Sequence, residues 1–122
     1  MTRWLQFVLL VVLAGCVTPS VPIPPPQPEL VYFTVDTAVG EATFRYGPDP
    51  SYQGATVYVF NRSAGEGIIT TAQVDGSVMM TQPFAALLGD EVVITFETQA
   101  QLSSTCLILQ DGQSSSGLEC EQ

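Results

Sequence analysis

The stretch Gly54-Ala55-Thr56-Val57-Tyr58-Val59-Phe60-Asn61 decides the fold class, because two sets of side chains alternate along it. Successive residues of a β-strand point to opposite faces of the sheet, so this period of two predicts a strand with one buried face. We expect a strand over residues 55–60, with Val57 and Val59 in the core. Tyr58 and Phe60 then share its outward face.

Short segments rich in β-branched and aromatic residues lie on both sides of this stretch, at 30–35, 41–46, 68–74, 77–82, 91–97, 105–109 and 117–120. Gly, Pro, Asp and Ser separate them, and Asp75-Gly76 is typical of a tight hairpin turn. Strands at intervals of about ten residues, without a helical period, predict an all-β antiparallel sandwich of about seven strands. We expect residues 84–88 to form a helical turn or a loop that closes one end.

The same alternation assigns the core face of the other segments. The side chains expected to point inward are Val31, Phe33, Val35, Ala42, Phe44, Val57, Val59, Val78, Met80, Val92, Ile94, Phe96, Cys106 and Ile108.

Three phrases of the chain resemble bacterial Ig-like domains of cell-surface proteins. Residues 54–61, 70–78 and 89–95 contain, in this order, the patterns G-x-x-V-x-V-x-N, A-x-x-D-G-S-[FV] and G-D-x-[VI]-x-[VI]. The resemblance covers roughly residues 30–110 and implies an Ig-like antiparallel β-sandwich. Carboxypeptidase-regulatory and prealbumin-like modules, which share this architecture, resemble the chain less closely.

Residues 1–16 resemble the type II signal peptide of bacterial lipoproteins. Arg3 precedes an apolar run over residues 4–13, and Leu13-Ala14-Gly15-Cys16 matches the lipobox. The run is about ten residues long, and a helix needs about twenty to cross a bilayer, so a signal peptide over 1–15 is favoured over a permanent span.

The lipobox resemblance implies cleavage before Cys16 and a diacylglycerol anchor on its sulfur, usually with a further acyl chain that makes membrane attachment stable. Val17 stands where an inner-membrane retention signal would carry Asp, which favours the outer membrane over the inner one. An ordinary signal peptide, whose cleavage removes Cys16, is the alternative.

Six of the twelve residues 17–28 are proline, so residues 16–28 are expected to form the lipidated cysteine and an extended linker. Polyproline II geometry would make this linker roughly 35 Å long. A ligand for an aromatic groove is the alternative reading of the prolines. Residues 29–122 are then the single folded domain.

Charge excludes several classes of function. The chain has three arginines, no lysine and no histidine. Against twelve acidic residues this gives a net charge of −9. No basic patch exists for nucleic acid, and the commonest general base and metal ligand is missing. Asp90 and Glu91 point to opposite faces of a strand, so they cannot face each other as an acid and base pair. We expect no enzyme activity, no cofactor and no bound metal.

Bound calcium is the alternative, since five aspartates lie at expected turns or strand ends: Asp36, Asp49, Asp75, Asp90 and Asp111. A solvated acidic surface is the favoured interpretation.

The chain has three cysteines, and lipidation of Cys16 would leave an even pair in an oxidising compartment. Cys106 and Cys120 flank a polar loop, so we expect a disulfide between them in preference to free thiols. A redox or metal role fits their spacing less well.

These observations favour a non-catalytic lipoprotein of the cell envelope, whose domain acts as a structural or protein-interaction module, its partner another envelope protein. The alternative is a carbohydrate-binding module that uses Tyr58 and Phe60 as an exposed aromatic surface. Cross-strand packing could instead account for these two rings. An envelope enzyme inhibitor is the third candidate.

Overall fold

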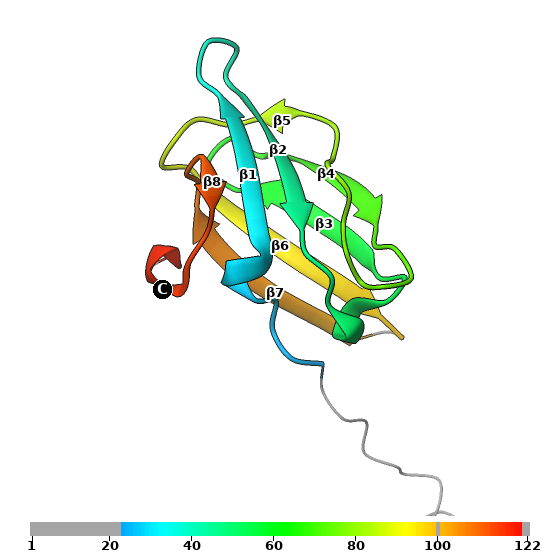
Figure 1. The fold of residues 1–122 in the computed structure, drawn as a ribbon. Coiled ribbons are helices and arrows are strands. Elements are labelled where there is room, and N and C mark those ends of the chain that lie inside the picture. The colour runs from blue at the N-terminus through cyan, green and yellow to red at the C-terminus, as the bar shows by residue number, and fades with distance from the viewer. Residues whose placement is uncertain (1–22, 100, 121–122) are drawn as a thin grey trace, which may run out of the picture.

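The computed structural model describes residues 23–99 and 101–120 (Figure 1). The expected signal peptide, the lipidation site Cys16 and the first part of the proline-rich linker lie outside the described residues. The strands are β1 (Val31–Asp36), β2 (Glu41–Tyr46), β3 (Thr56–Asn61), β4 (Glu66–Thr71), β5 (Phe84–Ala85), β6 (Glu91–Thr98), β7 (Gln101–Ile108) and β8 (Gly112–Gln113). Three 3-10 turns, η1 (Pro28–Leu30), η2 (Pro50–Tyr52) and η3 (Ser116–Leu118), complete the described elements.

The strands form two antiparallel sheets of four strands each, with the orders β5-β2-β1-β8 and β4-β3-β6-β7. The sheets face each other across the core, and the chain changes sheet after β2, β4, β5 and β7 (Figure 1). The expected all-β sandwich is confirmed. Its described part has eight strands instead of about seven, because β5 and β8 are two-residue strands at the edges of one sheet.

The core lies between the sheets and contains most of the side chains that alternation placed there. Ten of the expected residues are buried: Val31, Phe33, Ala42, Phe44, Val57, Val59, Val78, Val92, Ile94 and Phe96. Phe96 lies within an aromatic cluster, with its ring centroid 4.1 Å from that of Tyr52 and 4.9 Å from that of Tyr46. Since each large apolar side chain contributes about 1.5–3 kcal/mol when buried, this cluster is a main source of stability.

The expected core face of the last long strand was wrong. Cys106 and Ile108 were assigned inward, but Leu107 and Leu109 are the buried residues. β7 begins at Gln101 rather than at residue 105, and Leu107 pairs with the buried Val92 of β6. Four apolar residues in a row, 106–109, carry no period of their own, so alternation could not assign the face.

The strand expected over 77–82 is also absent from the described structure, and Met80 is not in the core. Val78 makes a single bridge to Tyr46. In a regular ladder Met80 would then pair with Phe44, but Thr81 takes this place and donates from its N–H to Phe44 O at 2.9 Å. The Thr81 hydroxyl accepts from Phe44 N–H at 3.0 Å. One extra residue therefore lies opposite β2, as in a β-bulge, and leaves Met80 60% exposed beside Met79, which is 68% exposed.

Residues 84–88 form neither a helical turn nor a plain loop. Phe84 and Ala85 make the short strand β5, which pairs with Ala42 and Glu41 of β2. The Phe84 side chain is buried, so this segment covers the edge of the core.

The end of the proline-rich segment lies against the sandwich. Pro24 O accepts hydrogen bonds from the hydroxyls of Tyr52 and Ser103, the latter at 3.0 Å. Ile23 N–H donates to Gln101 Oε1 at 3.0 Å, and Pro26 is buried. Residues 23–28 thus pack on the domain at the end where β7 begins. Within the described residues, no helix is long and apolar enough to cross a membrane.

Candidate functional site

The outer face of the β4-β3-β6-β7 sheet presents the two aromatic residues singled out by the sequence. Tyr58 and Phe60 alternate with the buried Val57 and Val59 along β3, so both project away from the core. Phe60 is 44% exposed, whereas Tyr58 is half-buried. The structure thus brings the two rings to one face of one strand.

Neighbouring strands extend this surface with aliphatic side chains. Ile69 of β4 lies opposite Tyr58 in the ladder and is 69% exposed, and Val93 of β6 lies opposite Phe60. Residues paired across a ladder share a face, so the four side chains are neighbours. We call Tyr58, Phe60, Ile69 and Val93 the outer-face patch. Ile69 and Val93 were not among the residues predicted from the sequence, although assigning faces by alternation over 68–74 and 91–97 would have found them.

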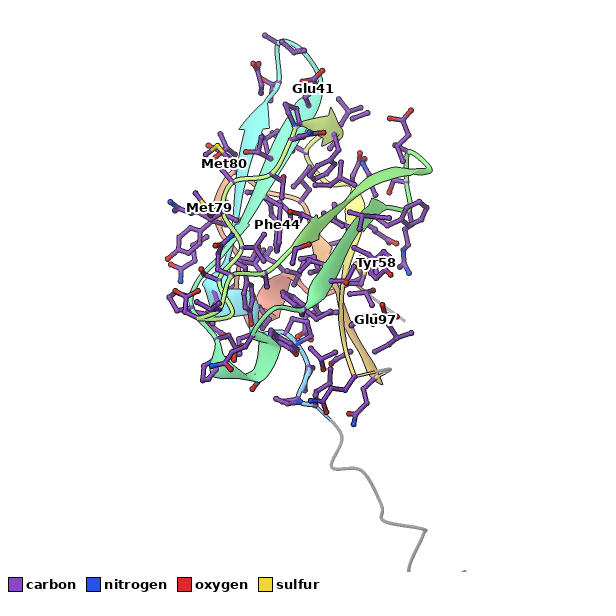
Figure 2. All side chains as sticks on the ribbon, turned by 90° about the vertical axis from the view of Figure 1, so that its right-hand side faces the viewer. Glu41, Phe44, Tyr58, Met79, Met80 and Glu97 are labelled. Carbon is purple, nitrogen blue, oxygen red and sulfur yellow. A yellow bond between two sulfur atoms is a disulfide. The ribbon has the colours of Figure 1, made fainter. Side chains whose placement is uncertain are left out.

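Glu97 places a carboxylate beside Tyr58 of this surface. The Tyr58 hydroxyl donates to Glu97 Oε1 at 3.3 Å, and both side chains lie on the same side of the molecule, well away from Met79 and Met80 (Figure 2). The carboxylate charge, with smaller contributions from burial and from the hydrogen bond, raises the pKa of Tyr58. The phenol therefore stays protonated at neutral pH and remains a donor.

The expected disulfide between Cys106 and Cys120 is present. It closes a loop with a sequence separation of 14 residues, and Cys120 N–H also donates to Cys106 O at 2.9 Å. The C-terminal segment is thereby joined to the outer edge of β7. Because Cys106 has the opposite orientation from the one expected, the disulfide lies on the outer face of the sheet rather than in the core.

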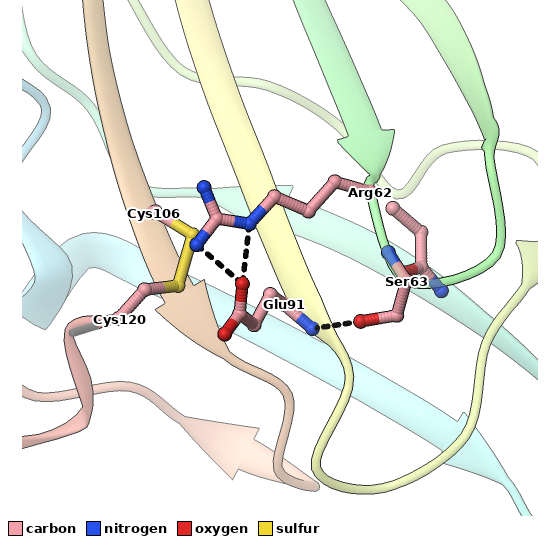
Figure 3. Close-up of a disulfide and its surroundings, with 6 residues drawn as sticks. Arg62, Ser63, Glu91, Cys106 and Cys120 are labelled. Atoms are coloured by element: carbon pink, nitrogen blue, oxygen red, sulfur yellow. Dashed lines mark hydrogen bonds and ion pairs between the residues drawn. A yellow bond between two sulfur atoms is a disulfide. The ribbon is translucent and has the colours of Figure 1, made fainter. Parts of the chain in front are cut away.

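Arg62 and Glu91 lie beside the disulfide (Figure 3). The guanidinium forms an ion pair with Glu91 Oε2, and Glu91 N–H donates to the Ser63 hydroxyl at 3.0 Å. Ligand atoms of Glu91, Cys106 and Cys120 lie within 4.8 Å of one another. Sulfurs joined in a disulfide are not thiolates, so this cluster offers a metal only a carboxylate that Arg62 already neutralises.

Asp49 has a structural role that the sequence did not indicate. It is only 3% exposed, and Oδ2 accepts from the Tyr46 hydroxyl at 2.7 Å and from Gln27 Nε2 at 3.4 Å. Oδ1 accepts from Ser51 N–H at 3.0 Å. The carboxylate joins β2, η2 and the linker end, and its partners come from segments whose proximity local sequence does not reveal.

The other four aspartates named as candidate calcium ligands accept hydrogen bonds from backbone N–H groups. Asp36 accepts from Ala38 N–H at 3.1 Å, and Asp75 from Ser77 N–H at 3.0 Å. The hydrogen bonds from Ser77 lower the pKa of Asp75. Asp90 accepts from Leu87 N–H and Asp111 from Val35 N–H, both at 2.9 Å. Asp36, Asp75 and Asp90 thereby stabilise turns, whereas Asp111 joins its loop to β1.

Two of the hollows in the described part of the chain lie outside the outer-face patch and carry polar groups. The larger, of about 800 Å³, is lined by hydroxyl and amide side chains, among them Thr56, Gln53 and Gln99, and by Glu97. The smaller, of about 250 Å³, lies on the other sheet between Met80 and Asp111. There the Arg45 guanidinium lies 4.8 Å from the Tyr32 ring centroid. This cation therefore already has an aromatic partner within the chain.

Comparison of the chain with known protein families, curated proteins and solved structures finds no match.

Proposed function

We propose that this chain is a lipid-anchored protein of the cell envelope, whose Ig-like sandwich binds another envelope protein through the outer-face patch. The observation that carries the proposal is the cluster of Phe60, Ile69, Tyr58 and Val93 on one sheet face. Isolated exposed apolar residues are common, but aromatic and aliphatic side chains gathered on one face are typical of protein interfaces. The Ig-like class is supported by the three sequence phrases together with the two four-stranded sheets.

The anchor is proposed from the lipobox that ends at Cys16. The Cys106–Cys120 disulfide supports export, because disulfides persist in oxidising compartments. Val17 supports the outer membrane over the inner one. Labelled palmitate should enter the wild-type chain and not Cys16→Ser, and label in the Cys16→Ser chain would overturn the anchor.

Matched surface substitutions test the proposed interface. Phe60→Ser and Ile69→Ser each remove an exposed apolar side chain from the patch, whereas Met79→Ser and Met80→Ser do the same on the opposite side, where the two methionines are 68% and 60% exposed. After chemical cross-linking in intact envelopes, we expect the patch variants to lose a cross-linked product that the methionine variants keep. Equal loss in both sets, or no product from wild type, would contradict the proposal.

Carbohydrate binding is the second candidate, because Glu97, which accepts the hydrogen bond from the Tyr58 hydroxyl, lines the larger polar hollow. A sugar could stack on the aromatic ring while its hydroxyls bond to the amide and hydroxyl groups nearby. Retention of wild type on immobilised glycans, lost with Tyr58→Ala and with Phe60→Ala, would favour this candidate. Absence of wild-type retention would exclude it.

A further inference from the structure

We propose that the free edge of β4 pairs with the same edge of a second copy of this chain, about a two-fold axis at Ile69. β4 stands at the end of its sheet, and within the described residues it pairs only with β3. The inference goes beyond the proposed function, because it concerns the edge of the strand and requires neither the lipid anchor nor a second kind of protein.

Hydrogen bonds on either side of β3 show which backbone groups of β4 are free. Ala72 N–H donates to Ala55 O at 2.8 Å, and Arg62 N–H donates to Glu91 O at 3.0 Å. Pairs in an antiparallel ladder alternate between hydrogen-bonded and non-bonded. Because Ala72 bonds to Ala55, every second residue before it, at 70, 68 and 66, also bonds to β3. The N–H and C=O groups of Gly67, Ile69 and Thr71 therefore point outward from the sheet.

The other sheet edges in the described part of the chain are less suited to pairing. β5 and β8 are two residues long, and β7 is partly covered because Cys120 N–H already donates to Cys106 O. Exposed edge strands are usually protected by lysine, proline or a bulge. The six residues of β4, Glu66–Thr71, include neither lysine nor proline, and their register with β3 is uninterrupted.

A second copy fits the free groups of β4. With the axis at Ile69, this residue lies opposite Ile69 of the second copy. Gly67 of each copy then lies opposite Thr71 of the other. All three outward residues are then in bonded pairs, each of which exchanges two N–H···O bonds. The contact also covers Ile69, which is 69% exposed, and extends the row formed by Tyr58 and Ile69 into the second copy.

Charge does not oppose this register. Glu66 is the single charged residue of β4 and would lie opposite Ala72 of the copy. The two Glu66 residues would be about 20 Å apart at about 3.3 Å per residue, well beyond the roughly 8 Å over which charges act at physiological salt. The remaining repulsion arises from the net charge of −9 on each chain, so added salt should strengthen the pairing.

Cysteine cross-linking tests both the pairing and its register. In a bonded antiparallel pair the Cα atoms are about 5.5 Å apart, which a disulfide can span. Ile69→Cys in the full chain, oxidised mildly in its native membrane, should therefore give a product of twice the chain mass. Thr71→Cys is the matched control, because two Thr71 residues would be about 13 Å apart. We expect at least tenfold less product from Thr71→Cys.

A second variant covers the case in which the cysteine chain folds poorly. Ile69→Lys keeps every backbone group and places two ammonium groups at the axis, so it should sediment as a monomer where detergent-solubilised wild type sediments as a dimer. Equal cross-linking of both cysteine variants, or a wild-type chain that is monomeric at every soluble concentration, overturns the inference. A cross-linked product whose mass is not twice that of the chain would also overturn the inference. It would show that a different protein, and not a second copy, pairs with the edge of β4.

Discussion

The Tyr46 hydroxyl donates a 2.7 Å hydrogen bond to the buried carboxylate of Asp49 and accepts one of 3.0 Å from Gln27 N–H. This pair lies where β2, η2 and the end of the proline-rich segment meet. A carboxyl group in the interior is stable only when its hydrogen bonds are satisfied, so the pair holds three segments of the chain together.

Tyr46→Phe is expected to lower the free energy of unfolding by about 1–3 kcal/mol, because it leaves the buried Asp49 carboxylate without its shortest hydrogen bond. Urea unfolding measures the change. Tyr32→Phe is the control, since the Tyr32 side chain is half-buried on the outer face of the same sheet, away from Asp49. Equal effects of the two substitutions would show that the Asp49 bond adds nothing.

Alkaline pH should destabilise the fold. Burial, as the largest cause, raises the pKa values of Tyr46 and Tyr52 above the usual tyrosine value of about 10. The unfolded chain then loses these protons first, so the stabilisation is complete below about pH 10 and is lost as pH rises beyond it. The free energy of unfolding, measured between about pH 9 and pH 11, should fall less steeply in Tyr46→Phe. An identical slope in the variant would contradict the assignment to Tyr46.

Gly76 should tolerate no side chain. It has a φ of +81°, and a Cβ there would lie 1.6 Å from Asp49 O. Gly89 has a similar φ of +90° with no atom within 4 Å of its Cβ position, so Gly89→Ala isolates the backbone strain, about 1–2 kcal/mol. Gly76→Ala should cost clearly more or prevent folding, as thermal unfolding of both variants would show. Similar melting temperatures would contradict the close packing of the 73–77 turn against Asp49.

Loss of the disulfide should destabilise the domain without rearranging it. Closing a loop of about fifteen residues contributes about 3 kcal/mol in the chain-entropy description. The double substitution Cys106→Ser and Cys120→Ser should lower the free energy of unfolding by about this amount while keeping the β-sheet circular dichroism spectrum. Mass spectrometry of the wild-type chain should show a gain of two hydrogens on reduction. No mass change would contradict the disulfide in the isolated protein.

Alternation along single strands was sufficient to predict the two-layer fold and the outward face of β3. It succeeded where polar residues flank the apolar ones, as with Thr43 and Arg45 on either side of the buried Phe44. It failed at Cys106 and Ile108, where a continuous apolar run has no period, and at Met80, where one extra residue interrupts the pairing with β2. A bulge depends on the partner strand, which local sequence does not specify.

The candidate site was predictable to the same extent. Tyr58 and Phe60 follow from the period of one strand, whereas their proximity to Ile69 and Val93 depends on the register of three strands. The partners of Asp49 lie up to 22 residues away, at Gln27, in a segment expected to be a free spacer. Such contacts arise from the tertiary fold and have no local signal.

Site-specific photo-cross-linking is the most direct test of the proposed interaction surface. A photo-reactive amino acid at position 60 of the full chain lies on the outer-face patch, and the same group at position 80 lies on the opposite side of the sandwich. In intact envelopes, we predict a distinct covalent product with another envelope protein from position 60 and none from position 80. The same products from both positions, or none from position 60, would contradict the account.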